Sequence, residues 1–195
     1  MNLPNKLTLS RFVLTAGFLA VLFSRTSYHQ TFALALFVAA SLTDYFDGMI
    51  ARRDKLITNF GILMDPLADK ILVCSAFIAF VDRDWIPAWM AVIVVARELA
   101  ITGLRLLAAS KNLVLAAEGF GKHKTISQIV AIIAILVKDS YTQWGPLGKV
   151  FGWPIAGTPW VNWFTSISLW AAVALTFVSG SIYLWRNRSL YLEDM

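Results

Sequence analysis

This chain of 195 residues alternates between long apolar runs and short polar segments. About 20 apolar residues cross the hydrocarbon core of a bilayer. By that measure, we expect membrane-spanning helices over 7–24, 31–53, 66–82, 86–109, 125–139 and 160–186. With 58% hydrophobic and 15% charged residues, the chain has too little polar surface for a water-soluble domain. We therefore predict an all-α integral membrane protein, a six-transmembrane-helix bundle forming a single domain over 1–195, with an N-terminal interfacial segment.

Basic residues indicate how the predicted bundle is oriented. Most of those near helix ends fall at one end of the bundle: Lys6, Arg11, Arg52, Arg53, Lys55, Lys111, Lys122, Lys124, Arg186 and Arg188. The positive-inside rule makes this end cytoplasmic. Tryptophans gather at the other end, as expected of interfacial rings: Trp85, Trp89, Trp144, Trp153, Trp160 and Trp163. The net charge of +5 is therefore assigned to cytoplasmic loops that face anionic lipid or phosphate-bearing substrates, and not to nucleic-acid binding.

Two pairs of aspartates lie at this cytoplasmic end. Asp44 and Asp47 are three residues apart near the end of the second predicted helix, so they share a face. Asp65 and Asp69 are four apart near the start of the third and also share a face. Four carboxylates at such range need a cation or protons, and hard divalent ions such as Mg²⁺ or Mn²⁺ prefer oxygen ligands. Capping and ion pairing with nearby basic residues is the structural alternative, and Asp54, which breaks the pattern, is expected to be solvated.

Small residues follow the first aspartate pair on the same helix. Gly48 and Ala51 continue the face of Asp44 and Asp47 with almost no side chain. Either could serve close helix packing alone. Beside a cluster of carboxylates, they also leave room for a bulky ligand.

The complete spacing, D-x2-D-G-x2-A-R-x8-G-x3-D-x3-D, resembles the signature of the CDP-alcohol phosphotransferases, integral membrane enzymes of phospholipid synthesis. It is met by Asp44, Asp47, Gly48, Ala51, Arg52, Gly61, Asp65 and Asp69. The resemblance implies two metal ions, Mg²⁺ or Mn²⁺, with Asp44, Asp47 and Asp65 as ligands. Asp69 would add a ligand or act as general base. It also implies a homodimer in the cytoplasmic (inner) membrane, with the active site facing the cytoplasm.

The same resemblance suggests which residues meet the nucleotide. Gly48, Ala51 and Arg52 would line its site. The N-terminal stretch "PNKLTLSR" resembles a family element whose counterparts here, Asn5, Thr8 and Arg11, would also face it. Taken alone, Arg11 could simply anchor the first helix at the interface.

Cations in the second half of the chain suggest an anionic acceptor. "ARELAITGLR" carries Arg97 and Arg105, and "GKHKT" carries Lys122 and Lys124. Arginine binds phosphate through a bidentate fork, and lysine adds point charge. These stretches resemble those of family members that use glycerol 3-phosphate, and that likeness assigns the four cations to the acceptor phosphate. Two structural alternatives stay open: an ion pair between Glu98 and Arg105, and a solvated loop for the lysines.

The expected activity is transfer of the phosphatidyl group from CDP-diacylglycerol to glycerol 3-phosphate, giving phosphatidylglycerol phosphate and CMP. Another acceptor, as in phosphatidylserine synthases or cardiolipin synthases of this type, is the nearer alternative. A divalent-metal transporter is the more distant one, because intramembrane acids also form ion pathways. The acids here gather at one membrane face, which argues against a pathway.

Overall fold

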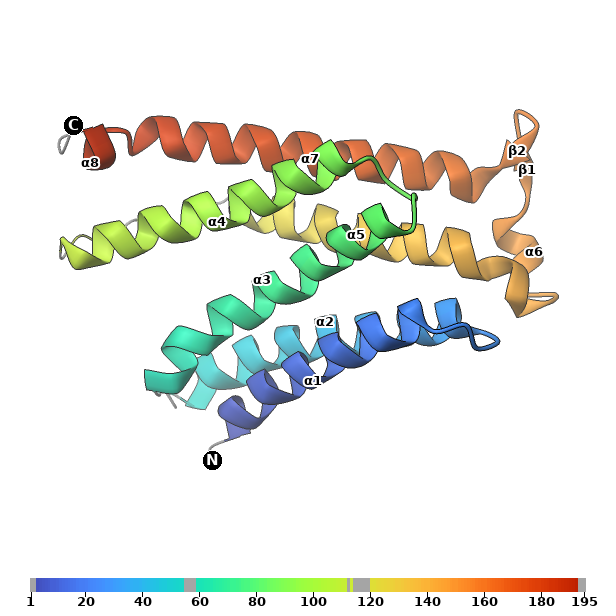
Figure 1. The fold of residues 1–195 in the computed structure, drawn as a ribbon, viewed down its shortest axis with the longest axis horizontal. Helices are drawn as coiled ribbons and strands as arrows, with labels where there is room; N and C mark the ends of the chain where they lie inside the picture. The colour runs from blue at the N-terminus through green and yellow to red at the C-terminus, as the bar shows by residue number, and fades with distance from the viewer. Residues whose placement is uncertain (1–2, 55–58, 112, 114–119, 193–195) are drawn as a thin grey trace.

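The computed structural model describes residues 3–54, 59–111, 113 and 120–192, and the side chains of 9–43, 67–68, 70–111, 113 and 123–192. Its long helices number six in these ranges: α1 Leu3–Phe23, α2 His29–Asp54, α3 Asn59–Asp82, α4 Ala88–Ser110, α5 Phe120–Ser140 and α7 Trp160–Arg186. They run side by side, and a short helix α8, Ser189–Leu192, follows the last. The two chain ends lie at the same end of the bundle (Figure 1). We call this the inner end and the opposite one the outer end.

Each predicted helix is present, but four begin earlier than expected, α2 by only two residues and α1, α3 and α5 by more. α1 begins at Leu3, so the expected interfacial segment forms the first turns of this helix, where Pro4 is tolerated. α3 begins at Asn59 and continues through Pro66, which we expected in its first turn. Proline removes one backbone hydrogen bond there, a loss that helices packed in a membrane accommodate. α5 begins at Phe120 and therefore includes the stretch before residue 125 that we expected to be a loop.

The apolar core joins all six long helices. α1 packs along α2, and α5 packs along α7, while α3 and α4 connect these two pairs. Phenylalanines fill the centre, with Phe18, Phe37, Phe77 and Phe80 wholly buried. A second, smaller cluster near the inner end joins Ile101 and Leu104 of α4 to Tyr183 of α7. The bundle is thus continuous from its outer to its inner end.

The predicted irregular loop over 140–159 is a compact structure at the outer end (Figure 1). It contains the 3₁₀ helix η1 Tyr141–Trp144, α6 Gly148–Phe151, and the antiparallel strands β1 Pro154–Ile155 and β2 Thr158–Pro159. The side chains of η1 bind the start of α2: Trp144 Nε1 donates to Thr31 Oγ1 at 3.0 Å, and Thr31 Oγ1 donates to Gln143 Oε1 at 3.0 Å. Gln143 also donates to Gln30. These bonds fix α2 and α5 relative to each other at the outer end.

The outward surface of the bundle is strongly apolar. On α4, Val92, Leu99 and Leu106 form a stripe of seven-residue spacing and are 63%, 66% and 65% exposed. On α7, Ile167 and Phe177 are similarly exposed. Soluble proteins rarely expose apolar surface on this scale. Two helical segments of the described chain, His123–Trp144 and Trp160–Arg186, are long and apolar enough to cross a membrane.

Candidate active site

The aspartate signature lies where α2 ends and α3 begins, at the inner end. Its first five positions, Asp44, Asp47, Gly48, Ala51 and Arg52, occupy the last turns of α2. Gly61, Asp65 and Asp69 occupy the first turns of α3. Both aspartate pairs are thus on helices, as expected. Their side chains lie outside those that the structure describes, as do those of Asn5, Thr8 and Lys122.

The metal site therefore rests on the chemistry of its predicted donors. Among the side chains that the structure describes, no group of three or more His, Cys, Asp or Glu could hold a metal ion. The predicted set, Asp44, Asp47, Asp65 and Asp69, supplies only carboxylate oxygens. Such a set fits Mg²⁺ or Mn²⁺ and does not match the nitrogen and sulfur ligands of zinc sites.

A second group of charged side chains belongs to the described residues and lies inside the bundle. Glu98 of α4 is 5% exposed, and Lys124 of α5 is 4% exposed. Lys124 Nζ donates to Glu98 Oε1. Arg97 Nη1 lies 3.4 Å from both carboxylate oxygens of Glu98. We call Arg97, Glu98 and Lys124 the inner charge cluster; it brings together two of the four cations predicted to bind the acceptor phosphate.

The alternative ion pair between Glu98 and Arg105 is not formed. Arg105 does not pair with this carboxylate but turns to α7, where its Nε donates to Tyr183 Oη at 3.5 Å. Its guanidinium carbon also lies 5.8 Å from the centre of the Tyr183 ring. Thr102, between the two on the helix, donates its hydroxyl to the Glu98 backbone oxygen at 2.7 Å. Arg105 is thus not part of the inner charge cluster, and the cation from another helix that pairs with Glu98 is Lys124.

The solvated-loop alternative also fails for Lys124, which lies in the first turns of α5 and is buried. Arg11 is buried as well, at 1% exposure, so the description of a simple interfacial anchor does not fit it. A long charged side chain is buried only where other groups compensate its charge. Both cations therefore belong to the interior of the inner half of the bundle.

A small cavity connects the inner charge cluster to α3. Glu98, Lys124, Thr125 and Gln128 line it together with Lys70 and Val73, and its volume is about 10 Å³. This volume admits one water molecule at most. Lys70 directly follows Asp69 in sequence, so α3 contributes both the predicted base and a wall of this cavity. Gln128 donates in turn to Thr176 Oγ1 of α7 at 2.9 Å, which fixes α5 against α7 at this level.

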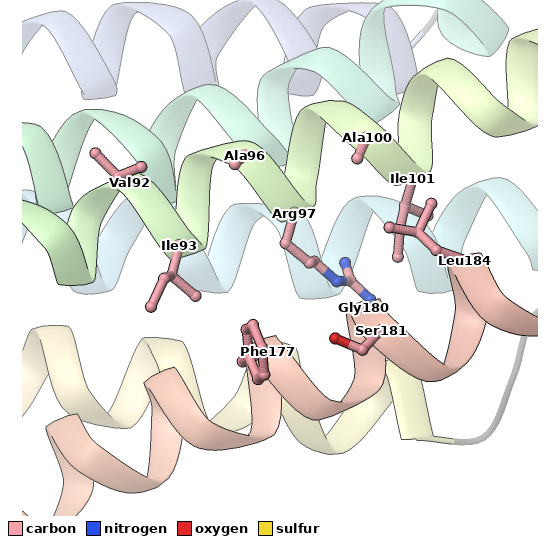
Figure 2. A pocket seen from close by; sticks show the side chains of 10 residues that line it. All are labelled: Val92, Ile93, Ala96, Arg97, Ala100, Ile101, Phe177, Gly180, Ser181 and Leu184. Carbon is pink, nitrogen blue, oxygen red and sulfur yellow. The ribbon is translucent and has the colours of Figure 1, made fainter.

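Arg97 also borders an apolar groove between α4 and α7 (Figure 2). The groove has a volume of about 270 Å³ and is lined chiefly by aliphatic side chains, with Phe177 and Ser181 on the α7 side. Gly180 is essential to this arrangement. A Cβ atom at position 180 would lie 2.7 Å from Arg97 Cγ. The missing side chain therefore lets the arginine stem lie against the backbone of α7 while its guanidinium reaches Glu98.

Comparison with known proteins identifies the family to which these features belong. The family model described as CDP-alcohol phosphatidyltransferase matches residues 1–178. The chain belongs to this family. It is therefore an all-α membrane protein of a transferase family, as the signature predicted. The described charge cluster and the signature helices both fall within the matched region.

Curated relatives cover nearly the whole length of this phosphatidyltransferase family member. It is 38% identical over 199 residues to the CDP-diacylglycerol–glycerol-3-phosphate 3-phosphatidyltransferase of Bacillus subtilis, covering 95% of each chain. A probable phosphatidylglycerophosphate synthase of Mycobacterium tuberculosis is 36% identical, covering 95% of this chain and 81% of the relative. The CDP-diacylglycerol–glycerol-3-phosphate 3-phosphatidyltransferase of Rickettsia typhi is 31% identical, covering 93% and 94%.

Sequence reasoning missed the partners that hold these cations in this phosphatidyltransferase. The partner considered for Glu98 was Arg105 on its own helix, as an alternative, and Gly180 and Thr176 were not singled out. Gly180 and Thr176 lie four residues apart on α7, a spacing of small residues typical of close helix contacts in membranes. That pattern could have marked α7 as the helix that α4 and α5 approach.

Proposed function

We propose that this protein transfers the phosphatidyl group from CDP-diacylglycerol to sn-glycerol 3-phosphate, producing phosphatidylglycerol phosphate and CMP. The relatives from Bacillus subtilis and Rickettsia typhi are named for this reaction. The observation that supports it here is the inner charge cluster, in which two cations, Arg97 and Lys124, meet at one carboxylate. A phosphate-bearing acceptor carries the group that such cations bind, whereas serine carries no phosphate.

The carboxylates of Asp44, Asp47, Asp65 and Asp69 would hold two divalent ions at the junction of α2 and α3. When bound, these ions supply charge neutralisation for a pyrophosphate and for the departing phosphate of CMP. Gly48 and Ala51 leave space for the nucleotide beside them, and Arg52 contributes positive charge. Asn5, Thr8 and Arg11 of α1 would complete the nucleotide site from the neighbouring helix, which packs along α2.

The transfer itself exchanges one phosphorus–oxygen bond for another. The acceptor hydroxyl oxygen bonds to the phosphorus that carries diacylglycerol, and the bond from this phosphorus to CMP breaks. CMP leaves with the bonding electrons as a phosphate anion. Asp69 takes the hydroxyl proton directly or through one water, because a carboxylate within hydrogen-bond reach serves as general base.

The acceptor phosphate would bind near the start of α5. Lys124 and Arg97 approach it from within the bundle, and Lys122 contributes from the first turn of the same helix. Arg105, held against Tyr183, adds positive charge on the approach from the inner end. Each cation is thus assigned to the acceptor and not to the nucleotide.

The lipid part of the donor requires access from the side of the bundle. The groove between α4 and α7 is apolar along its length and has Arg97 at its border (Figure 2). An acyl chain in this groove would keep its contacts with hydrocarbon along the whole length of the groove. The acyl chains would therefore enter between helices from the bilayer and not from water.

We further propose that all six long helices cross the cytoplasmic membrane, with the inner end towards the cytoplasm. The shortest of them have 21 residues, about 31 Å at 1.5 Å per residue, which matches a hydrocarbon core of about 30 Å. The protein would act as a homodimer. The exposed stripe of Val92, Leu99 and Leu106 fits either lipid or a second copy.

The decisive experiment offers CDP-diacylglycerol and Mg²⁺ to the purified protein in detergent with one acceptor at a time. Glycerol 3-phosphate, serine and phosphatidylglycerol distinguish the three candidate reactions within the family. We expect CMP release with glycerol 3-phosphate and none with the other two. Absence of CMP release with glycerol 3-phosphate would refute the proposal, and Asp69→Asn serves as the inactive control.

A further inference from the structure

Glu98 is a buried acid that the proposed chemistry does not use. It lies on α4 at 5% exposure and contacts cations from two helices, Arg97 of its own and Lys124 of α5. It is not one of the predicted metal ligands, and its backbone position is midway along a helix of 23 residues. A charged acid inside a membrane helix bundle costs free energy unless neighbouring groups compensate its charge.

Arg97 brings a further hydrogen-bond donor to the cluster. Two cations, Arg97 and Lys124, contact the one carboxylate of Glu98. The Nε of Arg97 is buried and makes no hydrogen bond within the described part of the chain. A buried donor without a partner costs free energy in an apolar bundle. An anion that binds beside Arg97 removes this cost.

The cluster is also built to keep its cations in place. Glu98 accepts from Lys124, Gln128 one turn further along α5 is bonded to Thr176, and Gly180 admits the stem of Arg97. Three helices, α4, α5 and α7, thus determine where the two cations lie. The adjoining cavity of about 10 Å³ is too small for phosphate, so an anion must meet the cluster at its border.

We propose that Glu98 is the positioning residue of the acceptor site: its carboxylate holds the Lys124 ammonium and the Arg97 guanidinium where the acceptor phosphate meets them. This role rests on the proposed function and names how that site discriminates its acceptor. Glu98 touches neither substrate. Preorganised cations bind a phosphate without the cost of ordering two long side chains at the moment of binding.

The test compares Glu98→Gln with wild type in purified protein, measuring kcat and the KM of each substrate together with the melting temperature. We expect the KM for glycerol 3-phosphate to rise about tenfold or more, as when one partner of a buried charge pair is removed. The KM for CDP-diacylglycerol should change less than about twofold, since the nucleotide site uses other residues. An equal rise in both KM values, or a lower melting temperature with unchanged kinetics, would overturn the proposal.

Asp139→Asn is the matched control, because it makes the same acid-to-amide change in a partly buried residue at the outer end of α5. It should leave the KM for glycerol 3-phosphate unchanged. If Glu98→Gln does not fold, Glu98→Asp tests the positioning role. This variant keeps the negative charge, but its side chain is one methylene shorter, so the carboxylate lies farther from Lys124. We expect Glu98→Asp to fold and to raise the KM for glycerol 3-phosphate alone, and an unchanged KM would refute the positioning role.

A charge exchange separates positioning from simple stabilisation. The double variant Glu98→Lys with Lys124→Glu rebuilds the ion pair but moves the ammonium from α5 to α4. If the pair only stabilises the bundle, the exchange restores both the melting temperature and the KM, which contradicts the proposal. Recovery of the melting temperature without the KM supports it. Wild-type CMP release with glycerol 3-phosphate, measured first, tests the proposed function independently of all these variants.

Discussion

Replacement of Gly180 by alanine tests how closely α7 must approach Arg97. The added Cβ would lie 2.7 Å from Arg97 Cγ and 3.6 Å from its Cβ. Carbon atoms in contact prefer about 3.5–4.0 Å, so the two groups must separate by roughly 0.8 Å or more. Cγ is too near the backbone to swing aside freely. Either the χ1 angle of Arg97 must change or α4 and α7 must move apart.

Both responses have a measurable cost. Overpacking of this kind lowers the free energy of unfolding by about 1–3 kcal/mol. A displacement of about 1 Å at a substrate-binding group lowers turnover by up to about a hundredfold. We therefore expect Gly180→Ala to lower the melting temperature and to reduce kcat/KM for glycerol 3-phosphate by about ten- to a hundredfold. CMP release and thermal unfolding in detergent measure the two effects.

Gly103→Ala is the matched control on the opposing helix. It lies within α4, it is exposed, and a Cβ there would meet nothing within 4 Å. Alanine in a helix is favoured over glycine by about 0.5–1 kcal/mol, so this variant should be neutral or slightly stabilised. In an Arg97→Ala background, the effect of Gly180→Ala on stability should largely disappear. Wild-type stability and kinetics in Gly180→Ala would refute the packing argument.

Three further outcomes follow from the site and the fold. Asp65→Asn should abolish CMP release and weaken Mn²⁺ binding measured by titration, whereas Asp54→Asn should do little; full activity in Asp65→Asn would contradict the metal site. Lys122→Ala should raise the KM for glycerol 3-phosphate about tenfold, and more than that for CDP-diacylglycerol; equal increases would count against its phosphate role. Trp144→Phe removes the bond to Thr31 and should lower the free energy of unfolding by about 1 kcal/mol with unchanged KM; an altered KM would show that the outer end acts on the site.

The helices were predictable because lipid leaves the chain few options. A backbone in hydrocarbon must satisfy its own hydrogen bonds, so each long apolar run becomes a helix. Their ends were less predictable, and α5 shows why. Its first residues, including Lys124, are polar and looked like a loop, but burial beside Glu98 continues the helix to Phe120.

The candidate site likewise has one part that the sequence predicts and another part that it does not. The aspartate spacing between 44 and 69 indicates a metal site and a family because both depend on residues close together in sequence. The partners of Glu98 and Arg105 depend on how α5 and α7 are placed, and local spacing carries no such information. A pair seven residues apart on one helix was plausible, but cations from other helices were nearer.

The inner charge cluster also has a consequence for how the protein enters the membrane during its synthesis. In the proposed topology α4 crosses the membrane with Arg97 and Glu98 near its middle, and a charged residue at the centre of a membrane helix opposes insertion by about 2.5–3.5 kcal/mol. The ammonium that compensates Glu98 is on α5, which is synthesised later. α4 alone is therefore expected to insert poorly into the bilayer, and we expect α4 and α5 to insert as a pair. A chain that ends at residue 111 should leave α4 exposed to water, and extension to residue 140 should bring both helices into lipid.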